Sequence, residues 1–270
     1  MLLDNKVGII TGAGSGIGRA SAVRMAKEGA DLGLFDISEA GLEETKRLIL
    51  AVAPDARVIC LKVDVSSESQ VKEAVESVTG TLGKLNVAFN NAGVIKGNGK
   101  VGELDTEAWE REFRINFFGA VYCSKYQIQQ MLKNDEPGAM VFTSSVGGII
   151  GTPFGASYCC SKSALASLAR VIMCDYADQN IRANAVCPGQ IDTPMYRGIM
   201  ANVVGDDPDA INEFIYKQNP QRRLCRPEEV AAVVTFLLSD QASYINGATV
   251  PVDGGNMGTN PAYDLMHFKP

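Results

Sequence analysis

Short apolar runs alternate along the chain with longer segments in which apolar residues recur at helical spacing. The runs span residues 7–11, 30–36, 57–63, 85–90, 139–144, 181–186 and 248–253. Their apolar residues are nearly continuous, as in strands that helices cover on both faces. Strands separated by helix-length segments are typical of βαβ units. The pattern therefore predicts an α/β fold in a single domain, a doubly wound (Rossmann) parallel sheet of about seven strands.

Two helix starts are marked by their residue types. Ser67 and Gln70 have the spacing of a capping box, in which each side chain binds a free backbone N–H of the other residue. Pro227, followed by Glu228 and Glu229, suits the first turn of a helix. We expect helices to begin at both places.

Residues 190–222 interrupt this alternation. The segment has no good strand and is too long for an ordinary connection. Long segments of this kind in compact domains are often lids or binding loops, although a variable surface insertion is the alternative. We expect a substrate-binding lid, because exposing all of its larger apolar residues would be costly. These are Met195, Tyr196, Ile199, Met200, Phe214, Ile215 and Tyr216.

Composition narrows the classes of function. Lysine and arginine total 25 against 31 aspartates and glutamates, a net charge of −6, and no stretch concentrates the basic residues. Nucleic acid and anionic membranes are therefore poor candidates as partners. The chain shows neither an apolar run of membrane-spanning length nor the pattern of a signal peptide. We expect a soluble, cytoplasmic protein.

The cysteines do not form a metal-binding or redox motif. There are seven of them, without a C-x-x-C spacing, and the chain has one histidine, His267. An odd, scattered set is what a reducing compartment permits. Cys159 and Cys160 are adjacent, and adjacent cysteines seldom form an unstrained disulfide. We expect no metal, and expect these two to pack their helix against its neighbours or a subunit interface.

A glycine-rich segment, Thr11 to Gly18, follows the first predicted strand and opens a helix. At such a turn the N–H groups and the positive end of the helix bind the pyrophosphate of a dinucleotide. The spacing is G-x-x-x-G-x-G at Gly12, Gly16 and Gly18, and neither G-x-G-x-x-G nor a Walker P-loop is present. The turn alone leaves a purely structural role and S-adenosylmethionine binding open.

The second predicted strand ends at Asp36, where a carboxylate can accept hydrogen bonds from the adenosine ribose. It would repel a 2′-phosphate, and neither Ser15 nor Ile37 offers a compensating cation. NAD(H) is therefore favoured over NADP(H). The alternative is that Asp36 caps the following helix. Arg19, already inside the first helix, is expected at the surface.

Tyr158 and Lys162 are four residues apart in a segment of helical periodicity and so share one helix face. Ser144 and Ser145 close the preceding strand, and Asn90 to Gly93 end the fourth strand, where open α/β sheets bind ligands. An ammonium about 4 Å from a phenol would supply about 4 kcal/mol at an effective dielectric of 20. That is most of the change needed to bring a tyrosine pKa from about 10 to about 7.

Together these motifs resemble the short-chain dehydrogenase/reductase family, in its simple one-domain branch, over Asn5 to Gly255. The resemblance rests on T-G-x-x-x-G-x-G at Thr11 to Gly18, Asp64, N-N-A-G at Asn90 to Gly93, Asn116, Ser145, Y-x-x-x-K at Tyr158 to Lys162, and Pro188 with Gly189. It implies that Tyr158 is the general acid/base and that Ser145 orients the substrate oxygen. It also implies that Lys162 binds the nicotinamide ribose and lowers the tyrosine pKa, and that Asn116 holds a proton-relay water.

The resemblance implies an NAD(H) site as well. Its residues would be Gly12, Ser15, Gly16, Ile17, Gly18, Asp36, Asp64, Val65, Asn90, Ala92, Gly93, Tyr158, Lys162, Pro188, Gly189, Ile191 and Thr193. Asp64 with Val65 would hold the adenine edge, and Thr193 would contact the nicotinamide carboxamide. Taken by themselves, Asp64 could be a strand-end turn residue and Asn116 a buried amide that satisfies backbone groups.

By this interpretation residues 1–255 form the catalytic domain, with 190–222 as its lid, and 256–270 form a tail. The expected function is NAD-dependent hydride transfer to or from a hydrophobic secondary alcohol or ketone, with a hydroxysteroid or bile acid as leading example. Small alcohols, sugars and cyclic diols stay open. The family is usually tetrameric, so we expect a homo-oligomer, in which the tail closes an active site or is simply frayed. The rivals are a non-catalytic NAD(H)-binding sensor or scaffold and a methyltransferase.

Overall fold

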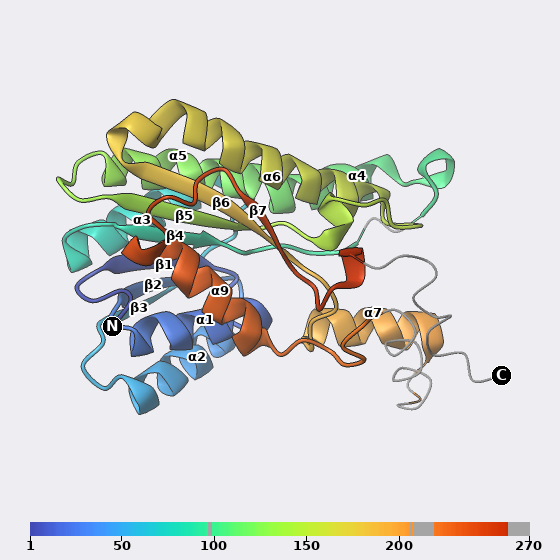
Figure 1. The fold of residues 1–270 in the computed structure, drawn as a ribbon, viewed down its shortest axis with the longest axis horizontal. Coiled ribbons are helices and arrows are strands. Elements are labelled where there is room, and N and C mark those ends of the chain that lie inside the picture. The colour runs from blue at the N-terminus through green and yellow to red at the C-terminus, as the bar shows by residue number, and fades with distance from the viewer. Residues whose placement is uncertain (97–98, 206, 208–218, 259–270) are drawn as a thin grey trace.

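A computed structural model of the chain describes residues 1–96, 99–205, 207 and 219–258. In this part, seven parallel strands form one sheet in the order β3-β2-β1-β4-β5-β6-β7 (Figure 1). Each strand lies within two residues of its predicted bounds, which confirms the predicted fold. The strands are β1 (Val7–Thr11), β2 (Asp31–Asp36), β3 (Val58–Lys62), β4 (Val87–Asn90), β5 (Gly138–Thr143), β6 (Ile181–Pro188) and β7 (Thr249–Val252).

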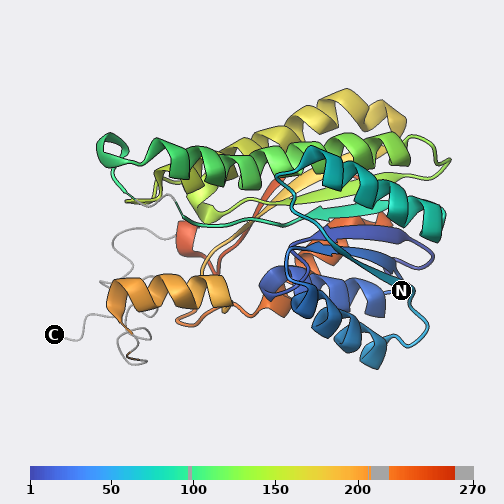
Figure 2. The same ribbon diagram turned by 180° about the vertical axis from the view of Figure 1, so that it is seen from behind.

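Helices cover both faces of the sheet, and Figures 1 and 2 show the two helical layers from opposite sides. One layer is made of α1 (Gly16–Lys27), α2 (Glu39–Val52) and α9 (Pro227–Leu238). The other is made of α3 (Glu68–Leu82), α5 (Gly119–Met131) and α6 (Ala156–Tyr176). The helix α4 (Thr106–Phe113) continues through a π-helical turn, Arg114–Phe118, into α5, and α7 (Pro194–Val204) lies beyond one end of the sheet.

The core consists of two hydrophobic layers, one on each face of the sheet. Phe35 and Phe142 are fully buried in the layer under α3, α5 and α6, and Phe89 is fully buried in the layer over α1, α2 and α9. Burying one such side chain stabilises the fold by roughly 1.5–3 kcal/mol. Because the strands are buried on both faces, their apolar residues are nearly continuous in sequence.

One of the two predicted helix starts differs in its contacts. Ser67 precedes α3, but its side chain makes no cap and lies 3.3 Å from the Ser69 hydroxyl. Gln70 accepts a hydrogen bond from the Asp64 N–H at 3.0 Å, so the predicted capping box is wrong. Both predicted helix starts are nevertheless confirmed, because α3 begins directly after Ser67 and α9 begins at Pro227. At the start of α9, Glu229 accepts a hydrogen bond from the Arg226 N–H at 2.8 Å.

Buried polar side chains of β6 hold the segment that carries β7. Asn184 accepts a hydrogen bond from the Ala248 N–H at 2.9 Å and donates to the Ile245 carbonyl at 2.8 Å. At the carboxyl end of β6, the Gly189 N–H donates to the Val252 carbonyl at 3.1 Å. The position of the Pro188–Gly189 turn therefore depends on β7.

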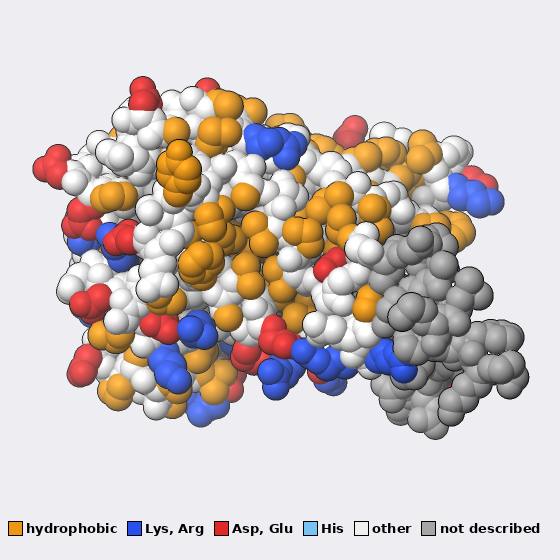
Figure 3. Space-filling view, in the orientation of Figure 1, with side chains coloured by type: hydrophobic (Ala, Val, Ile, Leu, Met, Phe, Trp, Pro, Cys, Tyr) orange, Lys and Arg blue, Asp and Glu red, His pale blue; other side chains and the backbone are white. Residues whose placement is uncertain are grey.

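β7 lies at the edge of the sheet, and hydrophobic side chains gather over it and its flanking helices in Figure 3. The exposed apolar side chains of this part of the chain include Val171 of α6, Phe236 of α9 and Tyr244. Within the ranges that the structure describes, none of the helices is long and apolar enough to cross a bilayer.

Candidate active site

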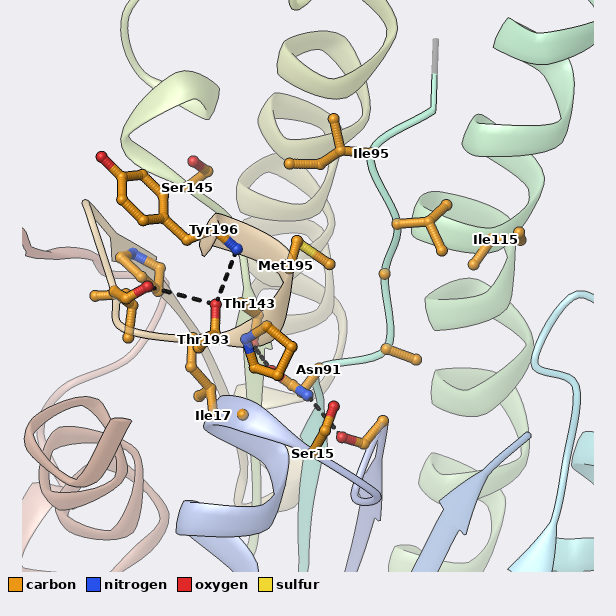
Figure 4. Close-up of a pocket in the computed structure, with 18 of the residues that line it drawn as sticks. Ser15, Ile17, Asn91, Ile95, Ile115, Thr143, Ser145, Thr193, Met195 and Tyr196 are labelled. Atoms are coloured by element: carbon orange, nitrogen blue, oxygen red, sulfur yellow. Dashed lines mark hydrogen bonds between the residues drawn. The ribbon is translucent and has the colours of Figure 1, made fainter. Parts of the chain in front are cut away.

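A cavity of about 420 Å³ opens where the strand order reverses, at the carboxyl ends of β1 and β4 (Figure 4). Ligands bind at this place in open α/β sheets. The cavity brings together most residues of the predicted NAD(H) site: Gly12, Ser15, Gly16, Ile17, Asp36, Asp64, Val65, Ala92, Gly93, Tyr158, Lys162, Pro188, Gly189, Ile191 and Thr193. Gly18 and Asn90 are not among its lining residues.

The glycine turn between β1 and α1 lets a ligand approach the backbone closely. Gly12 and Gly16 have φ angles of +66° and +51°, which favour glycine. A Cβ at Gly18 would lie 2.0 Å from the Gly12 carbonyl oxygen, so this glycine closes the turn and does not line the cavity. The Ser15 side chain makes no cap to α1, and the first residues of this helix, Gly16 and Ile17, line the cavity together with Ser15. This end of the cavity fits a pyrophosphate.

Asp36 ends β2 at the cavity and braces the glycine turn. One carboxylate oxygen accepts a hydrogen bond from the Gly14 N–H at 2.9 Å, and the other accepts one from the Ser38 N–H at 2.9 Å. A carboxylate has about four acceptor sites, so it can also accept hydrogen bonds from a ribose. The residues here fit the adenosine half of NAD(H).

Arg19 is not the surface residue that the sequence predicts. It is half-buried, and its guanidinium donates hydrogen bonds to the Gly14 carbonyl and to the Thr45 hydroxyl. The long side chain folds back under the glycine turn, which a position within a helix does not reveal.

Asp64 and Val65 line the cavity after β3, where the adenine was expected. The Asp64 carboxylate also accepts hydrogen bonds from the N–H and the hydroxyl of Ser66, at 2.9 and 2.7 Å. It therefore also fills the role of strand-end turn residue that the sequence left open.

The two asparagines after β4 have different partners, which corrects one predicted site residue. The side chains of Asn90 and Gln127 exchange two hydrogen bonds, at 2.9 and 3.1 Å, so Asn90 faces α5. Asn91 lines the cavity, where it donates to the Thr11 carbonyl and accepts from the Thr143 hydroxyl. Successive side chains point to opposite faces at a strand end, so only one of the pair reaches the site.

Ser144 and Ser145 are distinguished by their contacts. Ser144 donates its hydroxyl to the Lys162 carbonyl at 2.8 Å, which ties β5 to α6. Ser145 accepts a hydrogen bond from the Gly147 N–H at 3.1 Å, and its side chain lowers the pKa of the nearby Tyr158 phenol. The serine chosen from the sequence is thus the one beside the tyrosine.

The Tyr158 pKa differs from the sequence-based expectation. Burial raises it to about 12, although the neighbouring Ser145 side chain lowers it. The Lys162 ammonium lies 5.6 Å from the centroid of the tyrosine ring and donates to the Thr143 carbonyl at 2.7 Å. Burial of the phenol is thus the largest influence on this pKa.

Asn116 lies in the π-helical turn and is fully buried. Its side chain accepts a hydrogen bond from the Val94 N–H at 2.8 Å, and donates to the Val94 carbonyl at 2.9 Å and to the Ser161 hydroxyl at 3.2 Å. A Cβ at Gly93 would lie 3.2 Å from both the Asn116 Oδ1 and the Lys162 Nζ atoms, so the two side chains converge there. The amide thus satisfies backbone groups beside the site.

The segment that begins at residue 190 contributes to the cavity through α7. Thr193 precedes this helix, accepts a hydrogen bond from the Tyr196 N–H at 3.3 Å, and lies against Gly16. Met195, Tyr196 and Ile199 line the cavity, whereas Met200 is buried elsewhere. Phe214, Ile215 and Tyr216, and the tail from residue 259 onward, lie outside the described residues.

Several residues that line the cavity belong to no motif and were not predicted from the sequence. Apolar neighbours of the motifs, among them Val94, Ile95 and Ile115, complete the wall (Figure 4). Their signal was only their closeness in sequence to Gly93 and Asn116.

The cysteines of the described chain are all free, and Cys160 is exposed while Cys159 is half-buried beside Gly147 and Gly155. Within the described residues, no group of histidine, cysteine and acidic side chains could hold a metal ion.

Known proteins match this chain over nearly its whole length. A family model described as enoyl-(acyl carrier protein) reductase matches residues 12–256. Levodione reductase of Leifsonia aquatica is 39% identical over 93% of this chain and 94% of its own length. Meso-2,3-butanediol dehydrogenase of Serratia marcescens is 38% identical over 94% of this chain and 96% of its own length.

Solved structures agree with these matches. A crystal structure of levodione reductase has a TM-score of 0.92, with 96% of this chain and 100% of that chain covered. The structure of carveol dehydrogenase from Mycobacterium avium in complex with NAD has a TM-score of 0.91 at 29% identity, with 96% of this chain and 99% of that chain covered.

Proposed function

Because the chain belongs to the short-chain dehydrogenase/reductase family, we propose that it is an NAD(H)-dependent oxidoreductase that interconverts secondary alcohols and ketones. The observation that carries the proposal is the placement of Tyr158 and Ser145 in one cavity with the glycine turn and Asp36. NAD(H), when bound, supplies the hydride acceptor or donor.

In this proposal the protein residues position the substrate and move one proton. The Ser145 hydroxyl orients the substrate oxygen beside the Tyr158 phenol. A phenol with a raised pKa is neutral at physiological pH, so it can donate its proton to a ketone oxygen. In the opposite direction the same oxygen takes the alcohol proton, and the nearby Lys162 ammonium stabilises the phenolate. Asn116 fixes the backbone of Val94 beside them. In this proposal Asn116 also holds a proton-relay water.

NAD(H) rather than NADP(H) is the proposed cofactor because of Asp36. Its carboxylate already closes the turn through the Gly14 N–H, and its charge opposes a 2′-phosphate. The structural relative with NAD supports this choice.

We propose a small, uncharged, largely apolar substrate. The cavity of about 420 Å³ must admit both nucleotide and substrate, and its described lining holds three charged residues, Asp36, Asp64 and Lys162. Lys162 is the one cation of this described lining, and it is buried beside Tyr158 with one of its N–H groups bound to the Thr143 carbonyl, so a negatively charged substrate finds little compensating charge. The relatives are named for levodione and a butanediol, which supports a small ketone or diol. A hydroxysteroid, bile acid or sugar is the second candidate.

The lid and the assembly are proposals as well. Residues 1–255 would be the catalytic domain and 190–222 its lid, which the lining residues of α7 support. Exposed apolar side chains near the edge strand β7 support a homo-oligomer, and light scattering tests the tetramer. The free cysteines support a cytoplasmic location, which cell fractionation tests.

The test mixes purified protein with NAD⁺ and a panel of cyclohexanol, butane-2,3-diol, cyclohexanediols, a sugar and a hydroxysteroid, and follows absorbance at 340 nm. We expect NADH to form with small alcohols or diols. Tyr158→Phe should lower the rate by roughly 10²- to 10⁴-fold while NAD⁺ still binds in calorimetry. A non-catalytic sensor would instead bind NAD⁺ and turn over none of the panel, and a methyltransferase would bind S-adenosylmethionine in place of NAD⁺.

A further inference from the structure

The hydroxyl of Tyr196 is buried in the cavity wall without a hydrogen-bond partner among the described residues. Buried polar atoms in native proteins nearly always have a partner, so an exception calls for an explanation. The backbone at this position is fixed, since the Tyr196 N–H binds the Thr193 hydroxyl that precedes α7. The backbone of Tyr196 is therefore anchored, and its hydroxyl is available to a group that enters the cavity.

The surroundings of this hydroxyl indicate the kind of group. Tyr196 lines the same cavity as Ser145 and Tyr158, and Figure 4 shows Tyr196 and Ser145 on the same side of it. Its neighbours on α7 in the wall, Met195 and Ile199, are apolar and offer no competing hydrogen bond. Burial raises the pKa of Tyr196 to about 12, so its hydroxyl stays neutral and can both donate and accept.

We propose that Tyr196 is a specificity-determining residue whose hydroxyl binds a second oxygen of the substrate. The inference rests on the proposed function and narrows it to secondary alcohols and ketones that carry another hydroxyl or carbonyl group. An apolar alcohol enters the same cavity but leaves the phenol unpartnered. A site that hydrogen-bonds a substrate oxygen discriminates against an analogue that lacks this oxygen, because the buried group of the site is then left unpaired. An anionic second group is disfavoured, because the phenol carries no positive charge.

The experiment compares cyclohexanol with the isomeric cyclohexane-1,2-, 1,3- and 1,4-diols at saturating NAD⁺. These substrates share one ring and differ in the second hydroxyl. In the wild-type protein, at least one diol should have a kcat/KM about tenfold or more above that of cyclohexanol. Tyr196→Phe should lower kcat/KM for that diol about tenfold and leave cyclohexanol within twofold. Tyr244→Phe, at a fully exposed tyrosine, is the matched control and should change neither value.

A measurement without substrate accompanies the kinetics. Because the Tyr196 hydroxyl has no partner among the described residues, its removal should leave the urea midpoint unchanged or raise it. A lower midpoint for Tyr196→Phe would show that the hydroxyl stabilises the fold and would overturn the inference.

The outcomes separate the inference from the proposed function. If the wild-type protein oxidises both classes and Tyr196→Phe slows both equally or neither, the inference fails and the oxidoreductase stands. If the wild-type protein oxidises no alcohol or diol with NAD⁺, the proposed function fails, and the inference that depends on it fails too.

Discussion

Lys162 is joined to Thr143 by a hydrogen bond of 2.7 Å from its buried ammonium to the carbonyl oxygen at the end of β5. The bond directs the charged group across the strand end, and the Tyr158 ring lies beside it. Desolvation lowers the pKa of Lys162 to about 8, although the charge of Glu112 raises it. The ammonium is thus held in a place where water solvates it poorly.

This burial predicts a pH dependence of stability. The Lys162 pKa is lower in the folded protein than its ordinary value of 10.5, so between pH 8 and 10.5 the unfolded chain binds more protons. The lysine contribution to the free energy of unfolding therefore rises with pH across this window, by about 3 kcal/mol in all. In urea titrations, the free energy of unfolding of the wild-type protein minus that of Lys162→Met should increase by this amount as the pH rises across the window. Lys72→Met, at an exposed lysine, is the control, and parallel curves for all three proteins would contradict the prediction.

Asn116→Ala should lower the free energy of unfolding by about 2–4 kcal/mol, because it removes a fully buried side chain that makes two hydrogen bonds to the half-buried backbone of Val94 and one to Ser161. Urea denaturation measures the loss. Asn134→Ala removes one hydrogen bond to the Leu85 carbonyl and should cost about 1 kcal/mol. Equal losses in the two variants would argue against the bracing role of Asn116.

Asp36→Ala should lower the ratio of kcat/KM with NAD⁺ to kcat/KM with NADP⁺ about tenfold or more, because it removes a charge that opposes the 2′-phosphate. Asp36→Asn keeps an acceptor for the Gly14 N–H and removes only the charge, so it separates repulsion from loss of the turn. The ratio of kcat/KM values for the two nucleotides is the readout. An unchanged ratio in both variants would refute the role of this carboxylate.

Gly18→Ala should lower the free energy of unfolding by at least about 2 kcal/mol, because its Cβ would meet the Gly12 carbonyl oxygen at 2.0 Å. Gly80→Ala, at a helical position of α3 with no atom within 4 Å, should raise the free energy of unfolding by about 0.5–1 kcal/mol. Thermal unfolding compares the two. Destabilisation of both variants alike would show that the clash at Gly18 is relieved by movement of the turn.

The strands could be predicted because burial on both faces leaves a continuous apolar run in the sequence. The catalytic candidates could be predicted because their motifs have fixed spacing. What the sequence did not predict depends on side-chain partners brought together by the fold. Gln70 binds Asp64 in place of a capping box, and Asn90 faces Gln127 while Asn91 reaches the site.

Two electrostatic features were also beyond the sequence. The Tyr158 pKa depends on how much the phenol is desolvated, and residue spacing does not measure this. Tyr196 belonged to a predicted apolar segment, but a sequence does not show that its hydroxyl lacks a partner within the described residues.

The attachment of β7 to β6 bears on how the protein is made. The Gly189 N–H of the cavity wall depends on the Val252 carbonyl, 63 residues later in the chain. Domains form during synthesis from the N-terminus onward, yet this wall cannot be completed until the ribosome has released the last strand. The nascent chain is thus expected to acquire its glycine turn early and its complete site only after translation has passed β7.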